Sequence, residues 1–267
     1  HYSGNLFATL CWVLAGRQSH LMWSVPEVGN PPTHRHWRQK IGAWFNKLAS
    51  PYPRQVMYHS THSLAYHQAL GYATHNATVL PHQVQIPELY PMQQYGLRLK
   101  LLKRLNLAGD TFIVGSVARY EPELDITSLL QAATLASLHY PAMHWVLAGE
   151  GMDTNNQELT QLIASYSLEQ RVYLLGAVSE TEAASLVAAF DIATLTTRRD
   201  KLPPFLIEAM AHAIPVISTA SGDMTPLVTA TGTVVPHQRP ERLSAAWGEY
   251  YHMSQSARRA CGLRARQ

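Results

Sequence analysis

From Phe112 onward, short apolar runs alternate with longer amphipathic stretches, a pattern typical of successive β-α-β units. The apolar runs predict buried strands over 112–118, 144–148, 172–175, 192–196 and 215–218. The stretches between them predict helices over 126–138 and 157–166, a helix opened by a Ser179–Glu182 capping box, and a helix that carries Glu208. Right-handed crossovers would join these strands into a doubly wound parallel sheet, which binds ligands at the carboxyl ends of its strands.

The first eighty residues show the same alternation in a weaker form. They predict a helix over 6–15, a strand over 21–25, a helix over 37–48, a strand over 56–59, a helix over 64–70 and a strand over 77–80. The apolar run at 6–15 could also be the core of a signal peptide. No basic segment precedes it and no cleavage site follows, so a buried helix is the better interpretation.

A chain of 267 residues has room for two domains. Three prolines between Pro81 and Pro91 indicate a connection between them. We therefore expect a partial first domain over 1–86, a linker over 87–96 and a second domain over 97–267. The basic amphipathic stretch at 97–104 could contact an anionic membrane, but a solvated helix face is the simpler interpretation.

Composition narrows the function classes. Charged residues make up 15% of the chain against a usual ~25%, and a net charge of +3 is too small to predict nucleic-acid binding. The two cysteines, Cys11 and Cys261, have no metal-ligand spacing, and the histidines form no ligand pair, so we expect no metal. Two distant cysteines fit a reducing compartment, which favours the cytoplasm.

The strongest candidate chemistry lies between Asp200 and Glu208. Two prolines, Pro203 and Pro204, suit the first turn of a helix, where a missing N–H costs nothing. The amides of Phe205, Leu206 and Ile207 would then form an anion site at the helix start. A loop acid, an anion site and a helix acid suit a ligand with phosphates in the middle and hydroxyls at both ends. Taken singly, either acid could equally be an ordinary surface residue.

This segment resembles the Glu-x7-Glu signature of family 4 retaining glycosyltransferases, which have the B-type (GT-B) fold of two Rossmann-like domains. The match is Glu208-Ala-Met-Ala followed by Ile214-Pro215-Val216, while Asp200 and Lys201 replace the usual Glu-Gly. The resemblance implies that Glu208 holds the ribose of a nucleotide-sugar donor and that Asp200 contacts the transferred sugar. It implies no cofactor besides that donor substrate.

The resemblance extends to four further loops. Arg119 lies where the family binds the leaving diphosphate, but Leu124 replaces the Lys that normally assists it, and Lys201, Arg198 or Arg199 could substitute. Alternatively, Arg119 could form an ordinary surface salt bridge and have no role in binding phosphate. Gly149-Glu150-Gly151 corresponds to a Gly-x-Gly beside the donor, and Gly176 to Val178 to a loop that contacts the nucleobase. Ser221-Gly222 matches a Gly-rich turn near the diphosphate, although a plain turn would explain it equally well.

The resemblance is strong over 110–236 and weak before it. The family's first domain normally begins some 60–80 residues before His1, so we expect a fragment whose acceptor-side domain is incomplete and whose last helix is missing or cut. Pro26 stands where many members have an active-site His, and His34 and His36 nearby have no supporting spacing.

We therefore expect a retaining hexosyltransferase that uses a nucleotide sugar and a carbohydrate or lipid-linked sugar acceptor. Its expected location is the cytoplasm or the inner face of the membrane. The substitutions at Leu124, Asp200 and Pro26 leave a second interpretation open, an inactive relative that only binds a nucleotide sugar or a protein partner. A nucleotide-sugar epimerase is a third, but the Glu-Ala-Met-Ala context is unlike one.

Overall fold

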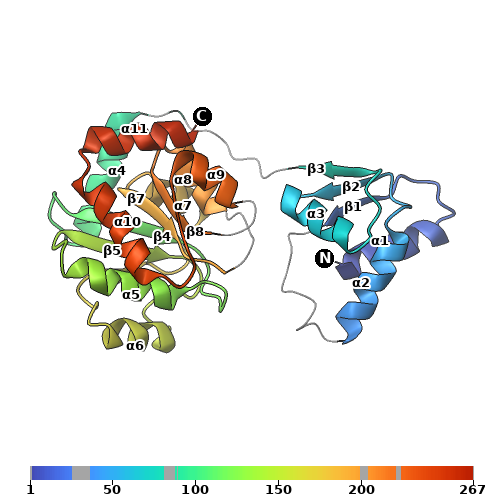
Figure 1. Cartoon of the computed structure of the whole chain (residues 1–267), viewed down its shortest axis with the longest axis horizontal. Helices are drawn as coiled ribbons and strands as arrows, with labels where there is room; N and C mark the ends of the chain where they lie inside the picture. The colour runs from blue at the N-terminus through green and yellow to red at the C-terminus, as the bar shows by residue number, and fades with distance from the viewer. Residues whose placement is uncertain are drawn as a thin grey trace. The chain divides into compact units, whose positions relative to one another are not determined.

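The computed structural model describes residues 2–25, 37–80, 88, 90–198, 204–220 and 224–266. These residues form two compact units, one ending at residue 80 and the other starting at residue 88 (Figure 1). Both units are α/β and both have parallel sheets, which confirms the predicted fold class.

The first unit contains a three-stranded parallel sheet in the order β1-β2-β3. The strands are β1 (Met22–Val25), β2 (Gln55–Tyr58) and β3 (Ala77–Val79), and the helices are α1 (Tyr2–Leu14), α2 (Trp37–Ala49) and α3 (Thr61–Ala69). The predicted alternation is confirmed, with ends that differ by a few residues. The prediction that the first helix is buried is wrong, because Phe7 and Leu14 of α1 are 69% and 78% exposed. The core of the first unit is a small cluster around the fully buried Trp23, Val56 and Tyr58.

The second unit is built on six parallel strands in the order β6-β5-β4-β7-β8-β9. They are β4 (Phe112–Val117), β5 (Met143–Ala148), β6 (Val172–Leu174), β7 (Ile192–Leu195), β8 (Val216–Thr219) and β9 (Thr233–Val235). The central strand, β4, pairs with β5 from Phe112 to Val117 and with β7 at Val114 and Gly115. This is the doubly wound order of Rossmann-like sheets.

Helices cover both faces of this sheet (Figure 1). The connecting helices are α5 (Ile126–Ser137), α6 (Gln157–Ser165), α7 (Glu180–Val187), α8 (Pro204–Ala211) and α9 (Met224–Thr231), followed by α10 (Pro240–His252) and α11 (Gln255–Arg266). Right-handed crossovers put α5 and α6 on one face and α7, α8 and α9 on the other. The last two helices divide between the faces, because α10 packs against α5 whereas α11 packs against α8 and α9.

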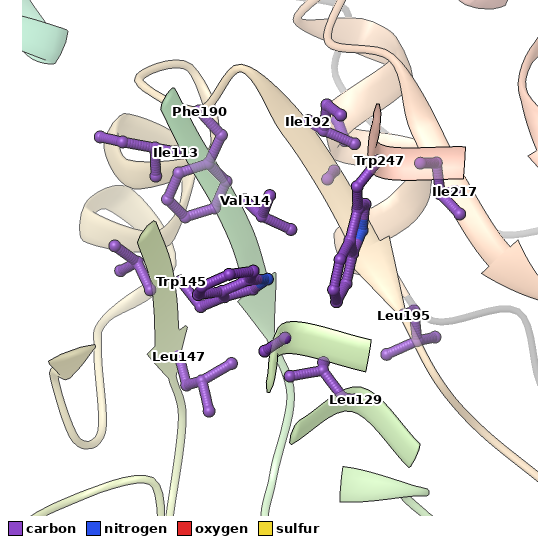
Figure 2. Packing of buried hydrophobic residues seen from close by; sticks show 14 of the residues in the cluster. Ile113, Val114, Leu129, Trp145, Leu147, Phe190, Ile192, Leu195, Ile217 and Trp247 are labelled. Atoms are coloured by element: carbon purple, nitrogen blue, oxygen red, sulfur yellow. The ribbon is translucent and has the colours of Figure 1, made fainter. Parts of the chain in front are cut away.

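Two tryptophans occupy the centre of the core (Figure 2). Trp145 of β5 and Trp247 of α10 are fully buried, with ring centroids 5.6 Å apart. The Trp247 indole Nε1 donates to the Thr194 hydroxyl of β7 at 2.9 Å, so its one polar atom is satisfied inside the core. These rings anchor α10 to the middle of the sheet and hold β7 in place beside β4.

The sequence predicts a linker over 87–96, but most of that segment belongs to helix α4, which spans Pro91–Arg104. Pro91 occupies the first helical turn, where proline is tolerated, rather than interrupting the chain. Leu101 and Leu102 bury the apolar face of the basic stretch in the core of the second unit. Among the described helices, none combines the length and the apolarity required to cross a membrane.

An ion cluster ties α4 and α11 to the amino ends of β4 and β7. The Asp191 carboxylate accepts from Arg98 Nη1 at 2.6 Å and from the Ile113 amide at 2.8 Å, and it lies 3.4 Å from Arg258 Nη2. The three side chains are 9–18% exposed. Removing the single carboxylate would leave two largely buried guanidinium groups without their counterion.

We predict that Asp191→Ala lowers the free energy of unfolding by about 3 kcal/mol, because it breaks a largely buried ion cluster. Urea denaturation followed by circular dichroism would measure the loss. Glu169→Ala, an exposed substitution, should stay within about 0.5 kcal/mol. A loss of less than about 1 kcal/mol for Asp191→Ala would show that the cluster contributes little.

Candidate functional site

The strand order reverses between β4 and β7, and this reversal defines the candidate site. The strands β5 and β6 follow β4 on one side, whereas β7, β8 and β9 lie on the other. The loops that leave the carboxyl ends of β4 and β7 lead to helices on opposite faces, so a crevice opens between them. Ligands of doubly wound sheets bind at this position.

Arg119 lies at this edge, two residues beyond β4. Its guanidinium Nη2 is 2.8 Å from the Glu150 carboxylate, and its Nε is 4.0 Å from Glu121. Arg119 and Glu150 are 63% and 68% exposed, so this ion pair is solvated and weak. The structure therefore contains the surface salt bridge that was the alternative for Arg119, in a form that an anionic ligand could displace.

The Gly149-Glu150-Gly151 loop packs directly against the end of β4. Gly149 has φ +130°, and a Cβ there would lie 2.1 Å from the Ala118 carbonyl oxygen, so only glycine fits. The loop is fixed by bonds from the Gly149 amide to Gly176 and from the Tyr120 amide to the Glu150 carbonyl. These contacts place the Glu150 side chain beside Arg119, which is the partner that the sequence could not identify.

Leu124, at the position of the family's lysine, is 9% exposed and belongs to the hydrophobic core. No cation therefore extends from this position. The next residue, Asp125, is buried, and its carboxylate contacts Arg198 Nη2 at 3.0 Å and accepts from the Ser128 hydroxyl at 2.8 Å. Sequence reasoning named Arg198 as a substitute cation but missed Asp125, whose only signal was an acid directly before a helix.

Helix α8 begins at Pro204, at the carboxyl edge just beyond β7. Phe205 and Leu206 are buried and Ile207 is partly buried, so the core holds the helix start in place. The amides nearest this end are those of Phe205, Leu206 and Ile207, because Pro204 has no amide hydrogen. The helix start thus has the donors and the positive dipole end of an anion site.

Glu208 lies one turn into α8 and is half-buried. Burial raises the pKa of its carboxyl group above the ordinary value of 4.5, and the nearby charge of Glu180 raises it further. Glu180 is the first residue of α7, which follows β6 and therefore starts at the same edge of the sheet. Hydrogen bonds from donors such as sugar hydroxyls would stabilise the ionised form of this carboxylate, which burial disfavours.

Val178 lies in the loop between β6 and α7, where it packs on the core as a partly buried residue. The next residue, Ser179, opens α7 with the predicted capping box, in which the Glu182 side chain accepts from the Ser179 amide at 3.0 Å. This fixed loop puts Val178 at the same sheet edge as Arg119 and Glu208.

Several predicted residues lie outside the described part of the chain. They are Asp200 and Lys201 of the signature, Arg199, Pro26, His34 and His36, and Ser221-Gly222. Among the residues that are described, no group of three or more His, Cys, Asp or Glu side chains is arranged to hold a metal ion.

The six-stranded sheet, with a guanidinium and a helix start beside its reversal point, defines an α/β protein with a doubly wound, Rossmann-like fold. The sequence model of the family described as glycosyl transferases group 1 matches residues 98–267. The chain therefore belongs to this family, glycosyltransferase family 4 with the GT-B fold.

Alpha-monoglucosyldiacylglycerol synthase of Acholeplasma laidlawii is 24% identical over 141 residues. The match covers 52% of this chain but only 35% of that relative, about a third of its length. Among solved structures, Alr3699/HepE of Anabaena in complex with UDP-glucose has a TM-score of 0.83 at 19% identity, over 100% of this chain and 71% of that one. Sucrose-phosphate synthase of Thermosynechococcus elongatus has a TM-score of 0.78 at 21% identity, over 98% and 66%. At these identities the likeness to solved structures shows a shared fold.

We predict that Glu208→Gln becomes more stable, relative to the unsubstituted chain, as pH rises from 4 to 7. The folded-state pKa of Glu208 lies above its unfolded value, so ionisation of the folded chain lowers stability as pH rises past 4.5. Below pH 4 the group is protonated in both states and the cost disappears. Urea denaturation at pH 4 and pH 7 would measure the difference.

The exposed Glu169→Gln substitution is the matched control and should show no such pH-dependent gain. A Glu208→Gln chain whose relative stability is the same at both pH values, or lower at pH 7, would contradict the raised pKa.

Proposed function

We propose that this chain carries the donor site of a retaining glycosyltransferase that moves a hexose from a nucleoside-diphosphate sugar to a hydroxyl acceptor. One observation carries the proposal. Arg119 follows β4 and helix α8 follows β7, so both lie at the carboxyl edge of the sheet where the strand order reverses. A guanidinium and helix-start amides bind phosphate oxygens. The family match over 98–267 supports a sugar nucleotide as the phosphate-bearing ligand.

Each residue of the proposed site has a separate role. Arg119 and the amides of Phe205, Leu206 and Ile207 would hold the diphosphate, with Gly149, Glu150 and Val178 lining the donor. Glu208 would accept hydrogen bonds from the ribose hydroxyls. Asp200 would orient the transferred sugar, as the resemblance to the family implies. Lys201, which stands where the family has Gly, would contact the donor as a substitute cation.

In the proposed reaction, the bond between the anomeric carbon and the diphosphate oxygen breaks, and the nucleoside diphosphate leaves with the electron pair. The acceptor oxygen bonds to the anomeric carbon on the same face, and its proton passes to the departing diphosphate or to solvent. Arg119 and the α8 amides act by stabilising the negative charge that develops on the leaving oxygen.

The similar proteins support particular substrates. UDP-glucose is bound in a HepE structure, and the Acholeplasma relative is named as a synthase of a glucosylated diacylglycerol. We therefore propose UDP-glucose as the first donor to test, and a carbohydrate or a lipid-linked hydroxyl as the acceptor. The buried Leu124 favours a second candidate, a relative that binds the donor but turns it over slowly or not at all.

We predict that one of UDP, GDP and ADP binds saturably in isothermal titration calorimetry, and that Glu208→Ala weakens this binding about 10- to 100-fold. The loss corresponds to about 1.5–3 kcal/mol for hydrogen bonds to a charged group. The exposed Glu169→Ala substitution serves as the control and should bind like the unsubstituted chain.

A folded chain that binds none of these nucleotides would contradict the donor site. Turnover separates the two candidates. Release of UDP from UDP-glucose, followed with and without a panel of hydroxyl acceptors, is expected for a transferase. Tight UDP binding without release under any of these conditions is expected for a relative that only binds.

A further inference from the structure

Among the described residues, Arg119 is the one side-chain cation that the proposed function assigns to the diphosphate. A nucleoside diphosphate carries several negative charges, and a leaving diphosphate gains more. Arg119 is solvated and already paired with Glu150. Leu124 is buried, so the loop between β4 and α5 adds no cation at that position. A second cation would have to come from another element at the same edge.

Arg198 is such a cation. It follows β7 by three residues, and its side chain is 51% exposed, whereas its partner Asp125 is only 1% exposed. Among the described residues, Asp125 is the partner of this guanidinium, through Nη2 alone. A guanidinium has five N–H donors in a planar fork, so one edge is anchored while the others face solvent.

The backbone fixes this arrangement at the crevice. The Asp125 amide donates to the Thr196 carbonyl at 3.1 Å, and the Arg198 amide donates to the Glu123 carbonyl at 2.9 Å. Between them, Leu124 and Thr197 form an antiparallel bridge. The loop after β4 is therefore tied to the segment after β7, the two strands that flank the reversal point. Arg119 and Arg198 therefore follow the two strands that flank the reversal point, one on each side of it.

Two neighbours other than Arg198 stabilise the negative charge of Asp125. Asp125 is the N-cap residue of α5, where the helix dipole stabilises a carboxylate, and the Ser128 hydroxyl donates to its Oδ2. The helix start and the Ser128 hydroxyl therefore stabilise the buried carboxylate together with Arg198.

We propose that Arg198, positioned by Asp125, is the second phosphate-binding cation of this site and takes the place of the charge missing at Leu124. This inference rests on the proposed function, because it assigns a residue to the same donor site. Arg198 would contact the phosphates together with Arg119, and Asp125 would act through Arg198 without touching the donor.

The test compares UDP, UMP and uridine in calorimetry, because only the phosphates should depend on Arg198. We expect Arg198→Ala to weaken UDP about 10- to 30-fold and UMP less, with uridine within about twofold. Arg198→Lys should lose about three- to tenfold for UDP, since it keeps the charge but not the fork. Asp125→Asn should also weaken UDP about three- to tenfold while leaving uridine unchanged.

Arg104→Ala, an exposed cation in the last turn of α4, is the matched charge control and should leave all three ligands within about twofold. If Arg198→Ala fails to fold because Asp125 is left unpaired, the neutral pair Asp125→Asn with Arg198→Gln replaces it, and the same phosphate-specific loss is expected. Unchanged UDP binding, or equal losses for UDP and uridine, would overturn the proposal. If UDP binds and Glu208→Ala weakens it while Arg198→Ala does not, only this inference fails. If GDP or ADP binds in place of UDP, the same comparison is made with that nucleotide, its monophosphate and its nucleoside. If none of the three nucleoside diphosphates binds, the proposed function fails.

Discussion

The reversal of strand order between β4 and β7 is the constraint on which the site depends. Because the loops beyond these strands diverge to opposite faces, the carboxyl edge opens there and nowhere else in the six-stranded sheet. The buried Trp145–Trp247 pair, bonded to Thr194 of β7, holds the two halves of the sheet in this order. Arg119, Arg198 and the start of α8 all reach the site because they follow one of these two strands.

Electrostatics at this edge is organised by burial. Glu208 is half-buried in α8, and this burial raises the pKa of its carboxyl group. Asp125 is also buried, but its carboxylate lies at the start of α5 and is paired with the Arg198 guanidinium. Arg119, by contrast, is exposed and paired with an equally exposed Glu150. The proposed site therefore combines one loosely held cation with one rigidly held cation, so that ligand binding would require only Arg119 to change partners.

The sequence predicted the strands of the second unit well because they are buried on both faces and form nearly continuous apolar runs, as in Phe112–Val117. It did not predict β9, whose three residues show no periodicity, and it placed Pro91 in a linker although that residue begins a helix. Arg119 and Glu208 could be singled out because each adjoins a recognisable strand or helix start. The Asp125–Arg198 pair could not, because it joins residues 73 positions apart that meet only when β7 lies beside β4.

A crystal structure of the chain soaked with UDP would test the central claim most directly. The account predicts diphosphate density at the carboxyl edge between β4 and β7, with phosphate oxygens about 3 Å from the guanidinium of Arg119 and near the amides that begin α8. Density at the opposite edge, in the cavity of about 310 Å³ lined by Arg98, Asp191 and Arg258, would contradict it. A chain that is saturated with UDP in solution but has no nucleotide at the reversal point would contradict it equally.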